Sequence, residues 1–347
     1  GCNLLGYYMY HGGQNPEGKL TTLEENIATG SLNDMSVKNY DFRAPLGQYG
    51  MPNGTYNEIK LYAMFVHDFG VKFAEADTFL PETNPVTASN FTDLRTSWRS
   101  YNCKCGKKRG WTFASSFQRR YKMADHKNIV LENKEYDVKF PAVDVLDGDF
   151  FFIPFNMKCG ESEIATSLCT PLCRLDNERK AFVFYSNARP AGRTFVKASN
   201  VASSDKTDGT YYQFVGNPTD AEDIVTLTRA DAEKAHKVVS GNTQYILITE
   251  NIMYQESGNG KTTLNFQSDG NIRFKIFPAL KNVPKGLERK SDENGFAVYE
   301  KSNCAKTAPA VTFEKIKEDE NMASYKINVN AFEGLDDAFI KIAYTAN

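Results

Sequence analysis

Only one segment of this 347-residue chain has the pattern of a strand, a loop and then a long amphipathic helix. Residues 1–10 form an apolar and aromatic run without polar alternation, which is typical of a strand buried on both faces of a parallel sheet. After a long loop, a helix is predicted over residues 56–75 by apolar side chains at helical spacing, which are Ile59, Met64, Phe65, Phe69 and Phe73. A parallel sheet needs several such units, so we do not expect the first 75 residues to close into a fold by themselves.

Beyond a polar linker at residues 80–90, the chain changes to short β-like runs separated by turn signals. Runs at this spacing favour an antiparallel sandwich architecture. The predicted strands cover residues 111–116, 129–131, 135–140, 149–154, 181–185, 194–198, 245–248, 262–266, 272–277, 297–299, 325–329 and 339–344.

One further helix is predicted among these strands, from a capping-box-like start at Thr228 and Asp231 to a stop at Gly241. Its apolar face would be formed by Ala232, Ala235, Val238 and Val239.

Charge and hydropathy argue against several classes of partner. The net charge is −2, and no basic stripe is present, so nucleic acid is not an expected partner. No apolar run reaches about 18 residues, so no membrane span is expected. No signal peptide is expected either, and both ends of the chain are interpreted as cut and not as finished termini.

The seven cysteines do not fit a complete disulfide framework, because an odd number leaves at least one cysteine without a partner. Cys103 and Cys105, and Cys169 and Cys173, do not have the usual spacing of zinc ligands, and no histidine lies nearby in the sequence. We therefore expect no metal and no cofactor, and we interpret the cysteines as buried thiols or as one opportunistic disulfide.

Four segments in order resemble bacterial members of glycoside hydrolase family 35, the β-galactosidases. Residues 7–16 read YYMYHGGQNP, where the family usually has Thr in place of Gln14. Residues 39–45 read NYDFRAP and are followed by GQYG, which is similar to the family's SYDYDAP-x-x-E-x-G, with Phe42 and Arg43 departing from it. Weaker similarities lie at residues 110–126 and 227–235.

The resemblance implies a (β/α)8 TIM barrel with β-sandwich domains behind it, and removal of terminal β-linked galactose with retention of configuration. Retaining hydrolysis uses two carboxyl groups about 5–5.5 Å apart. In this family both are Glu, after the fourth and seventh barrel strands, and this chain would start at the eighth. The resemblance thus places both catalytic residues outside these 347 residues.

The same resemblance suggests which residues contact substrate. Tyr10, His11 and Asn15 would lie at the C-terminal end of the eighth strand, where such barrels have their active sites. Tyr40 matches a tyrosine that lines the galactose pocket, where its ring can pack on the sugar and its hydroxyl can hydrogen-bond to a sugar oxygen. Phe42 would contact the sugar by packing only. His11 is either a hydrogen-bonding residue behind the pocket or a purely structural one.

Other features have ordinary structural interpretations. Asp41 is expected to hold its loop through hydrogen bonds, and the remaining loop acids are expected to be solvated. Trp98 and Trp111 are interpreted as core residues in preference to sugar platforms. Residues 258–261 are interpreted as a hairpin turn, because the full spacing of a phosphate-binding loop is absent.

The expected fold is therefore mainly β, with β-sandwich domains preceded by the last βα unit of a TIM barrel. The predicted boundaries are residues 1–78 for that unit, 79–215 for a β-sandwich, and 216–347 for a second β-rich domain with one helix. The expected partners are a galactose-containing oligosaccharide or polysaccharide and, for the unpaired unit, the N-terminal part of the barrel or a second copy. A non-catalytic carbohydrate-binding or assembly module is the alternative. The resemblance also implies that the parent protein is periplasmic or extracellular.

Overall fold

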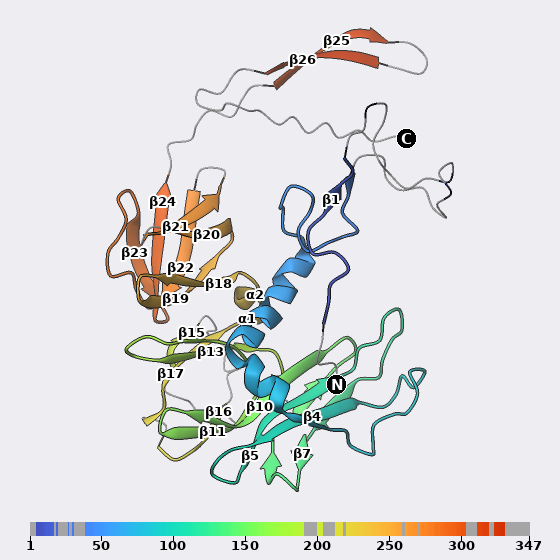
Figure 1. The fold of residues 1–347 in the computed structure, drawn as a ribbon, viewed down its shortest axis with the longest axis vertical. Helices are drawn as coiled ribbons and strands as arrows, with labels where there is room; N and C mark the ends of the chain where they lie inside the picture. The colour runs from blue at the N-terminus through green and yellow to red at the C-terminus, as the bar shows by residue number, and fades with distance from the viewer. Residues whose placement is uncertain are drawn as a thin grey trace. The chain divides into compact units, whose positions relative to one another are not determined.

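The long helix α1 (Gly54–Glu75) packs among several β-sheets in the computed structural model of the chain (Figure 1). The structure describes residues 5–16, 19, 27, 30, 39–190, 200–203, 212–217, 220–258, 261–268, 271–302, 311–318 and 323–329. Within these residues the fold is mainly β, as the sequence predicts, with α2 (Arg229–Glu233) as the second helix. Neither of these two helices is long and apolar enough to cross a lipid bilayer.

The chain divides into two compact units. The first comprises residues 1–268 and 272–301, and the second comprises residues 269–271 and 302–347. In the second unit, the described strands β25 (Val311–Glu318) and β26 (Ala323–Val329) pair as an antiparallel hairpin.

The largest sheet of the first unit has six antiparallel strands in the order β16-β11-β10-β5-β4-β3. Pro154 of β10 lies opposite Trp111 of β5, and Trp98 of β4 lies opposite Thr112. Its strands are β3 (Asp77–Phe79), β4 (Arg95–Asn102), β5 (Lys108–Ser115), β10 (Phe150–Cys159), β11 (Ser162–Ser167) and β16 (Tyr212–Val215).

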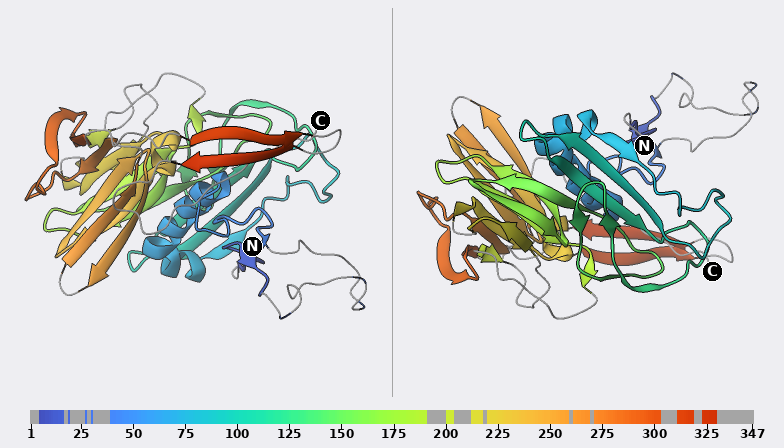
Figure 2. Two further views of the ribbon diagram at one scale, coloured as in Figure 1. Left: turned by 90° about the horizontal axis from the view of Figure 1, so that it is seen from above. Right: turned by 90° about the horizontal axis from the view of Figure 1, so that it is seen from below.

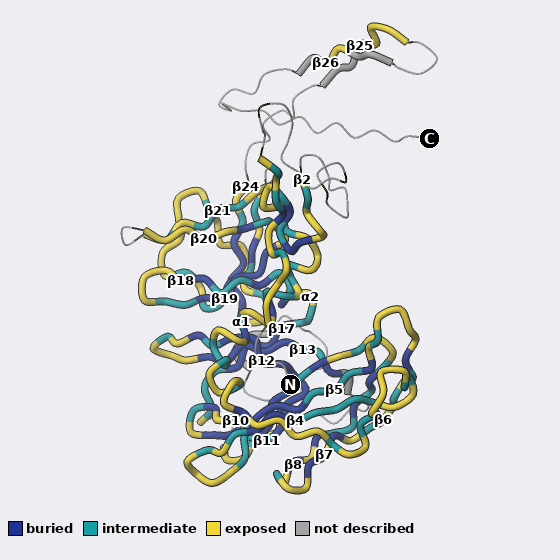
Figure 3. The backbone as a smooth tube through the Cα atoms, turned by 45° about the vertical axis from the view of Figure 1, so that its right-hand side comes forward, coloured by how far each residue is buried: buried dark blue, intermediate teal, exposed yellow. Residues whose placement is uncertain are grey.

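A mixed four-stranded sheet has the order β12-β13-β17-β15. Here β17 runs parallel to both β13 and β15, whereas β12 and β13 are antiparallel. The strands are β12 (Cys169–Leu175), β13 (Ala181–Ser186), β15 (Asn200–Ser203) and β17 (Asp223–Leu227). Figure 3 shows that buried residues run through much of β10, β12 and β13.

Smaller sheets complete the region around the six-stranded sheet. One has the order β14-β9-β6, and another pairs β7 with β8. These strands are β6 (His126–Ile129), β7 (Glu132–Asn133), β8 (Val138–Lys139), β9 (Val143–Val145) and β14 (Arg189–Pro190).

A five-stranded sheet with the order β18-β19-β22-β24-β23 follows α2 and lies beside the hairpin of β20 and β21 (Figures 1 and 2). The hairpin places Gly258 opposite Lys261, which confirms the predicted turn position. These strands are β18 (Ala235–Ser240), β19 (Thr243–Thr249), β20 (Ile252–Gly258), β21 (Lys261–Gln267), β22 (Asn271–Phe277), β23 (Glu288–Glu293) and β24 (Phe296–Ser302).

The helix α1 is shared between two cores. Phe65 is 1% exposed, and its ring centroid lies 4.7 Å from that of Phe152 and 5.7 Å from that of Trp111, on the six-stranded sheet. Leu61, one turn earlier, belongs to the core built by β12, β13, β17 and β19. The predicted helix over residues 56–75 is thus confirmed, with its start two residues earlier.

The predicted strand over residues 1–10 is wrong in its described part. Residues 5–10 form no strand, and the side chains of Leu5, Tyr7 and Tyr8 are exposed. A strand buried on both faces needs neighbouring strands to hydrogen-bond with, and no described strand pairs with these residues. The parallel-sheet context that would cover them is not present in the described residues.

The second predicted helix is correct at its start and wrong at its end. The Thr228 hydroxyl accepts a hydrogen bond from the Asp231 backbone N–H at 3.0 Å, as a helix N-cap does. The helix ends at Glu233, and the residues from Ala235 onward form β18, with Val238 opposite Tyr245 of β19. Two adjacent β-branched valines favour a strand once a partner strand is available.

Several other expectations have clear outcomes. Of residues 135–140 only Val138 and Lys139 form a strand, and β6 ends at Ile129. The predicted strands at 194–198 and 339–344 lie outside the described residues. Trp98 and Trp111 are 2% and 4% exposed, which confirms them as core residues.

The described cysteines fit the interpretation as buried thiols with one disulfide. Cys103 and Cys105 are disulfide-bonded to each other. Cys159, Cys169 and Cys173 are free and buried. Burial raises the pKa of the Cys159 thiol to about 12, which keeps it protonated.

Candidate functional site

The two segments with the most specific motifs lie side by side. β1 (Gly13–Gln14) pairs antiparallel with β2 (Asn39–Tyr40), with Gly13 opposite Tyr40. Residues 10–12 also bond to Leu46, further along the second segment. The Gly12 N–H donates to the Leu46 carbonyl at 2.7 Å, and the Leu46 N–H donates to the Tyr10 carbonyl at 2.9 Å. Residues 10–14 and 39–46 therefore form one local structure although residues 15–38 separate them in sequence.

The glycine pair makes this close approach possible. A Cβ atom on Gly13 would lie 2.5 Å from the ring of Tyr40, and a Cβ atom on Gly12 would overlap the carboxylate of Asp41. Both distances are shorter than atoms tolerate, so a side chain at either position would displace Tyr40 or Asp41. The glycines thus determine where the predicted sugar-contacting tyrosine lies.

Asp41 holds the loop, as predicted. Its Oδ1 atom accepts a hydrogen bond from the Gln48 backbone N–H at 2.8 Å. The Gln48 side chain in turn donates from Nε2 to Oε1 of Gln14 at 2.9 Å, and its own Oε1 is buried and has no hydrogen-bond partner among the described residues. This side-chain contact joins Gln14 of β1 to Gln48, across 34 positions of sequence. Sequence reasoning did not single out this pair.

Aromatic rings gather beside Tyr40. The ring centroid of Phe42 lies 5.8 Å from that of Tyr40 and 5.7 Å from that of Tyr8, in edge-to-face geometry. Phe42 is 51% exposed and has a φ of 47°, and Arg43 follows with a φ of 55°. Left-handed backbone at two consecutive non-glycine residues costs about 1–2 kcal/mol each, and such strain is most often found at functional sites.

The remaining predicted residues lie along the same loop. Tyr10 is partly exposed and contacts the ring of Tyr7 at 5.7 Å. Burial, with smaller contributions from Tyr56 and Tyr7, raises the pKa of Tyr10, so its hydroxyl stays protonated and able to donate. The His11 side chain is exposed, and its Nδ1 donates to the Gly12 carbonyl at 2.7 Å, a bond within its own loop. Asn15 is half-buried at the end of β1.

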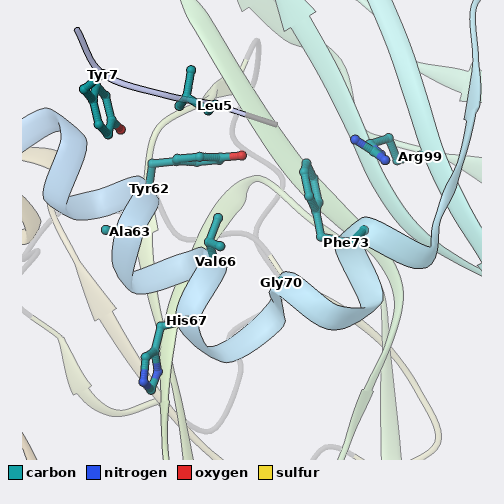
Figure 4. Close-up of a pocket in the computed structure, with 10 residues that line it drawn as sticks. Leu5, Tyr7, Tyr62, Ala63, Val66, His67, Gly70, Phe73 and Arg99 are labelled. Atoms are coloured by element: carbon teal, nitrogen blue, oxygen red, sulfur yellow. The ribbon is translucent and has the colours of Figure 1, made fainter. Parts of the chain in front are cut away.

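Beside this loop, one face of α1 is not covered. A cavity of about 530 Å³ is lined by Leu5 and Tyr7 and by residues of α1. Figure 4 shows Tyr62, Val66 and Phe73 on the side of the helix that borders this cavity, with Tyr7 above Tyr62. Tyr62 and Val66 are each 38% exposed. This face continues the helical spacing of apolar residues but has no described element packed on it.

At the far end of this face, a cation caps the aromatic surface. The Arg99 guanidinium lies 4.5 Å from the ring centroid of Phe73, and its Nη2 donates to the Ala76 carbonyl at 3.2 Å. The Nε atom of Arg99 is buried, and no described residue accepts a hydrogen bond from it. The uncovered face therefore combines apolar rings with an unsatisfied donor at one edge, which is typical of a surface that packs against another polypeptide.

Comparison with other proteins assigns no family. No protein-family model matches the chain, and no curated protein is similar enough to match it. Among the described residues, no group of three or more His, Cys, Asp or Glu side chains is placed to hold a metal ion.

Proposed function

We propose that this chain is part of a retaining β-galactosidase, to which it contributes the last βα unit of the catalytic barrel and the β-sandwich domains behind it. The observation that carries the proposal is the pairing of Gly13 with Tyr40, which brings the two most specific motif segments into one loop structure. That loop presents several aromatic rings at an exposed edge. Sugar-binding sites use this combination, because aromatic rings pack on the apolar face of a pyranose.

The residues have distinct roles in this proposal. The hydroxyl of Tyr40 has no hydrogen-bond partner among the residues that the structure describes, so it is available for a sugar oxygen. Phe42 supplies a ring without a hydroxyl and contacts the sugar by packing. Tyr10 supplies a protonated hydroxyl at the other end of the paired segment. His11 is given a structural role, because its Nδ1 is already bonded within the loop.

The chemistry needs two carboxyl groups on opposite sides of the glycosidic bond. Asp41, the acid nearest to Tyr40 in sequence, accepts a hydrogen bond from Gln48 and serves the loop. The resemblance assigns both catalytic carboxylates to barrel strands outside these 347 residues. The uncovered face of α1, with Tyr62, Val66 and Phe73, is where the rest of the barrel would pack. The parent protein would act outside the cytoplasm, on galactose-containing saccharides.

A direct test compares this chain with an N-terminally extended one from the same coding sequence. We expect no hydrolysis of a chromogenic β-galactoside by the 347-residue chain and clear hydrolysis by the extended chain. In the extended chain, Tyr40→Phe should lower kcat/KM by about 10- to 100-fold, because one hydrogen bond to the substrate is lost. Tyr49→Phe is the matched control, since Tyr49 is 78% exposed in the same loop.

Two results would contradict the proposal. One is hydrolysis by the 347-residue chain itself at a rate comparable to that of the extended chain. The other is an extended chain that encodes no further strand-helix units and has no galactosidase activity. Equal losses of kcat/KM for Tyr40→Phe and Tyr49→Phe would show that Tyr40 does not contact the substrate, although the proposed galactosidase activity would still stand.

A non-catalytic carbohydrate-binding module is the second candidate, and a different surface favours it. The rings of Phe91 and Tyr121 are stacked at 4.5 Å with an interplanar angle of 14°, and Tyr121 is 58% exposed. Phe117, which is 52% exposed, lies nearby in sequence. If this candidate is correct, the 347-residue chain binds a galactan in calorimetry and Tyr121→Ala abolishes the heat, whether or not an extended chain hydrolyses galactosides.

A further inference from the structure

A cavity of about 430 Å³ separates the first turns of α1 from the segment that runs through the end of α2, β18 and the start of β20. Its volume is within the range of small-molecule sites. From α1 it is lined by Tyr56, Asn57 and Lys60, and from the opposite side by His236 and Tyr254 among others. These residues belong to the first compact unit, and Leu46, Gly50 and Pro52, at the end of the segment that contains Tyr40, line the cavity as well.

The acidic residues of the lining are already neutralised. Glu233 Oε1 lies 2.7 Å from Nε of Arg229, and Glu250 Oε1 lies 2.5 Å from Nζ of Lys234. The second pair also accounts for Lys234, the other lysine of the lining. Each of the two carboxylates in the lining therefore already has a cationic partner of its own.

Lys60 is a further cation of the lining. Its ammonium group makes no hydrogen bond and no ion pair in the part of the chain that the structure describes, and its Nζ atom lies over the ring of Tyr56, 5.8 Å from the centroid. Burial lowers the pKa of Lys60 to about 8, although Glu233 acts in the opposite direction. At neutral pH the group is mostly protonated, and Glu233 influences it only from a distance, without the direct ion pair that a partly buried ammonium normally has among its neighbours.

His236 lies in the same wall and also has no hydrogen bond to a described residue. Burial, followed by the charge of Lys60, lowers its pKa to about 3. It is therefore a neutral imidazole at neutral pH, with one N–H donor and one acceptor nitrogen. Two unused donors thus border one cavity, and Tyr56 and Tyr254 add aromatic rings to its walls.

We infer that this cavity binds an anionic sugar residue, with its carboxylate or sulfate group on Lys60 and His236 and its ring against Tyr56 and Tyr254. An anion supplies the acceptors that both donors lack, and a pyranose ring fits a cavity of this size between two aromatic walls. The inference does not rest on the proposed function, because none of the four residues it uses is a sugar contact in that proposal, and because it is tested by binding and not by hydrolysis.

The test is isothermal titration calorimetry on the 347-residue chain with three hexoses, which are galacturonate, galactose 6-sulfate and galactose, and with acetate as an anion that has no sugar ring. We expect one or both anionic sugars to bind at least about tenfold more tightly than galactose, and also more tightly than acetate. A preference between galacturonate and galactose 6-sulfate identifies which anionic group the site takes. Equal affinity for galactose and both anionic sugars would overturn the inference, as would no binding of either anionic sugar.

Variants separate a built site from general charge attraction. Lys60→Gln should weaken binding of the anionic sugar by at least about tenfold and leave that of galactose unchanged. Lys72→Gln is the matched control, because Lys72 lies on the same helix and is 58% exposed beside Glu75. Equal losses of affinity in the two variants would show that the anion is attracted by the general positive charge of the surface, and would overturn the assignment to Lys60.

The pH dependence needs no variant and so does not depend on how Lys60→Gln folds. The groups that face Lys60 are Glu233 and Lys234 at the end of α2, His236 on β18, Glu250 and Tyr254 beyond β19, and Tyr56 on its own helix. With the Lys60 pKa at about 8, the anion-binding form is lost as pH rises. Affinity for the anionic sugar should fall by about tenfold or more between neutral pH and about pH 9.5. A flat profile over this range would exclude Lys60 as the anion's partner.

Discussion

Nζ of Lys237 lies 2.8 Å from Oδ2 of Asp68 and 3.0 Å from its Oδ1, which ties β18 to α1 across 169 positions of sequence. Both side chains are largely buried, at 16% and 9% exposure. The same carboxylate accepts a hydrogen bond from the Arg174 backbone N–H of β12 at 2.7 Å. One acidic residue of α1 therefore holds the helix against two different sheets.

We expect Asp68→Ala to destabilise the chain by about 3 kcal/mol, because it leaves the largely buried ammonium of Lys237 and the N–H of Arg174 without their acceptor. Urea denaturation followed by circular dichroism measures the loss. Glu75→Gln is the control on the same helix, since the Lys72–Glu75 pair is more than half exposed and should contribute less than about 1 kcal/mol. Similar losses of unfolding free energy in both variants would show that the buried ion pair contributes no more to stability than the exposed one.

The packing of α1 gives a second prediction. Phe65→Ala should cost about 3–5 kcal/mol, because a fully buried ring is removed from between α1 and the six-stranded sheet. Val66→Ala, at the neighbouring position on the uncovered face, should cost less than about 1 kcal/mol in this chain. Thermal unfolding of the two variants side by side is the measurement. A large loss for Val66→Ala would mean that the cavity beside Tyr62 is closed in solution.

His236 should make the chain sensitive to mild acid. Its pKa is lowered to about 3 in the folded state from 6.5, so stability is fully present above 6.5 and is lost as pH falls toward 3. Between neutral pH and about pH 4 this residue should account for a loss on the order of 2 kcal/mol. His236→Gln should flatten the stability profile in that window. A profile that remains as steep in the variant would assign the acid sensitivity to other groups.

Asp68 acts in a lower pH window. Burial alone would raise its pKa, but hydrogen bonds from Arg174, Lys237 and His67 outweigh burial and lower it. The stability that this carboxylate contributes is therefore present above its unfolded pKa and is lost only as pH falls through the folded value. Asp68→Asn should change the profile below about pH 4 and leave the window of His236 unaffected.

Lys60 should lower stability in the absence of ligand. Its folded pKa of about 8 is below the ordinary value of 10.5, so the protonated group is penalised in the folded state. Lys60→Met should stabilise the chain by about 1–2 kcal/mol at neutral pH. The gain should shrink as pH rises from 8 toward 10.5, because the wild-type lysine loses its charge there. Denaturant titrations at neutral and alkaline pH measure both effects.

Sequence patterns predicted the parts of this fold that depend on neighbours in sequence. The spacing of Phe65, Phe69 and Phe73 predicted α1, and Thr228 predicted the start of α2, because both signals are local. Ala235 onward became a strand because β19 pairs with it, and residues 5–10 did not become one because no described strand does. Those outcomes depend on tertiary contacts, which override local propensity.

The candidate sites show the same division. Tyr40 and the glycine pair were found from motif resemblance, and the structure explains why the glycines are needed there. The contact between Gln14 and Gln48 could not be predicted, because it joins residues 34 positions apart in sequence and no local pattern links them. Lys60 and His236 are 176 positions apart (236 minus 60) and have no motif, so only a structure brings them to one cavity.

Because α1 completes the cores of two sheets, the chain cannot be divided where its sequence changes character. Removing residues 1–78 would remove Phe65 from its contact with Trp111 and Leu61 from the core that includes β12. Both sheets would then expose large apolar surfaces to water. Such a truncation should be insoluble when expressed alone. For the same reason, recombination between related genes would have to transfer the helix together with the sheets behind it.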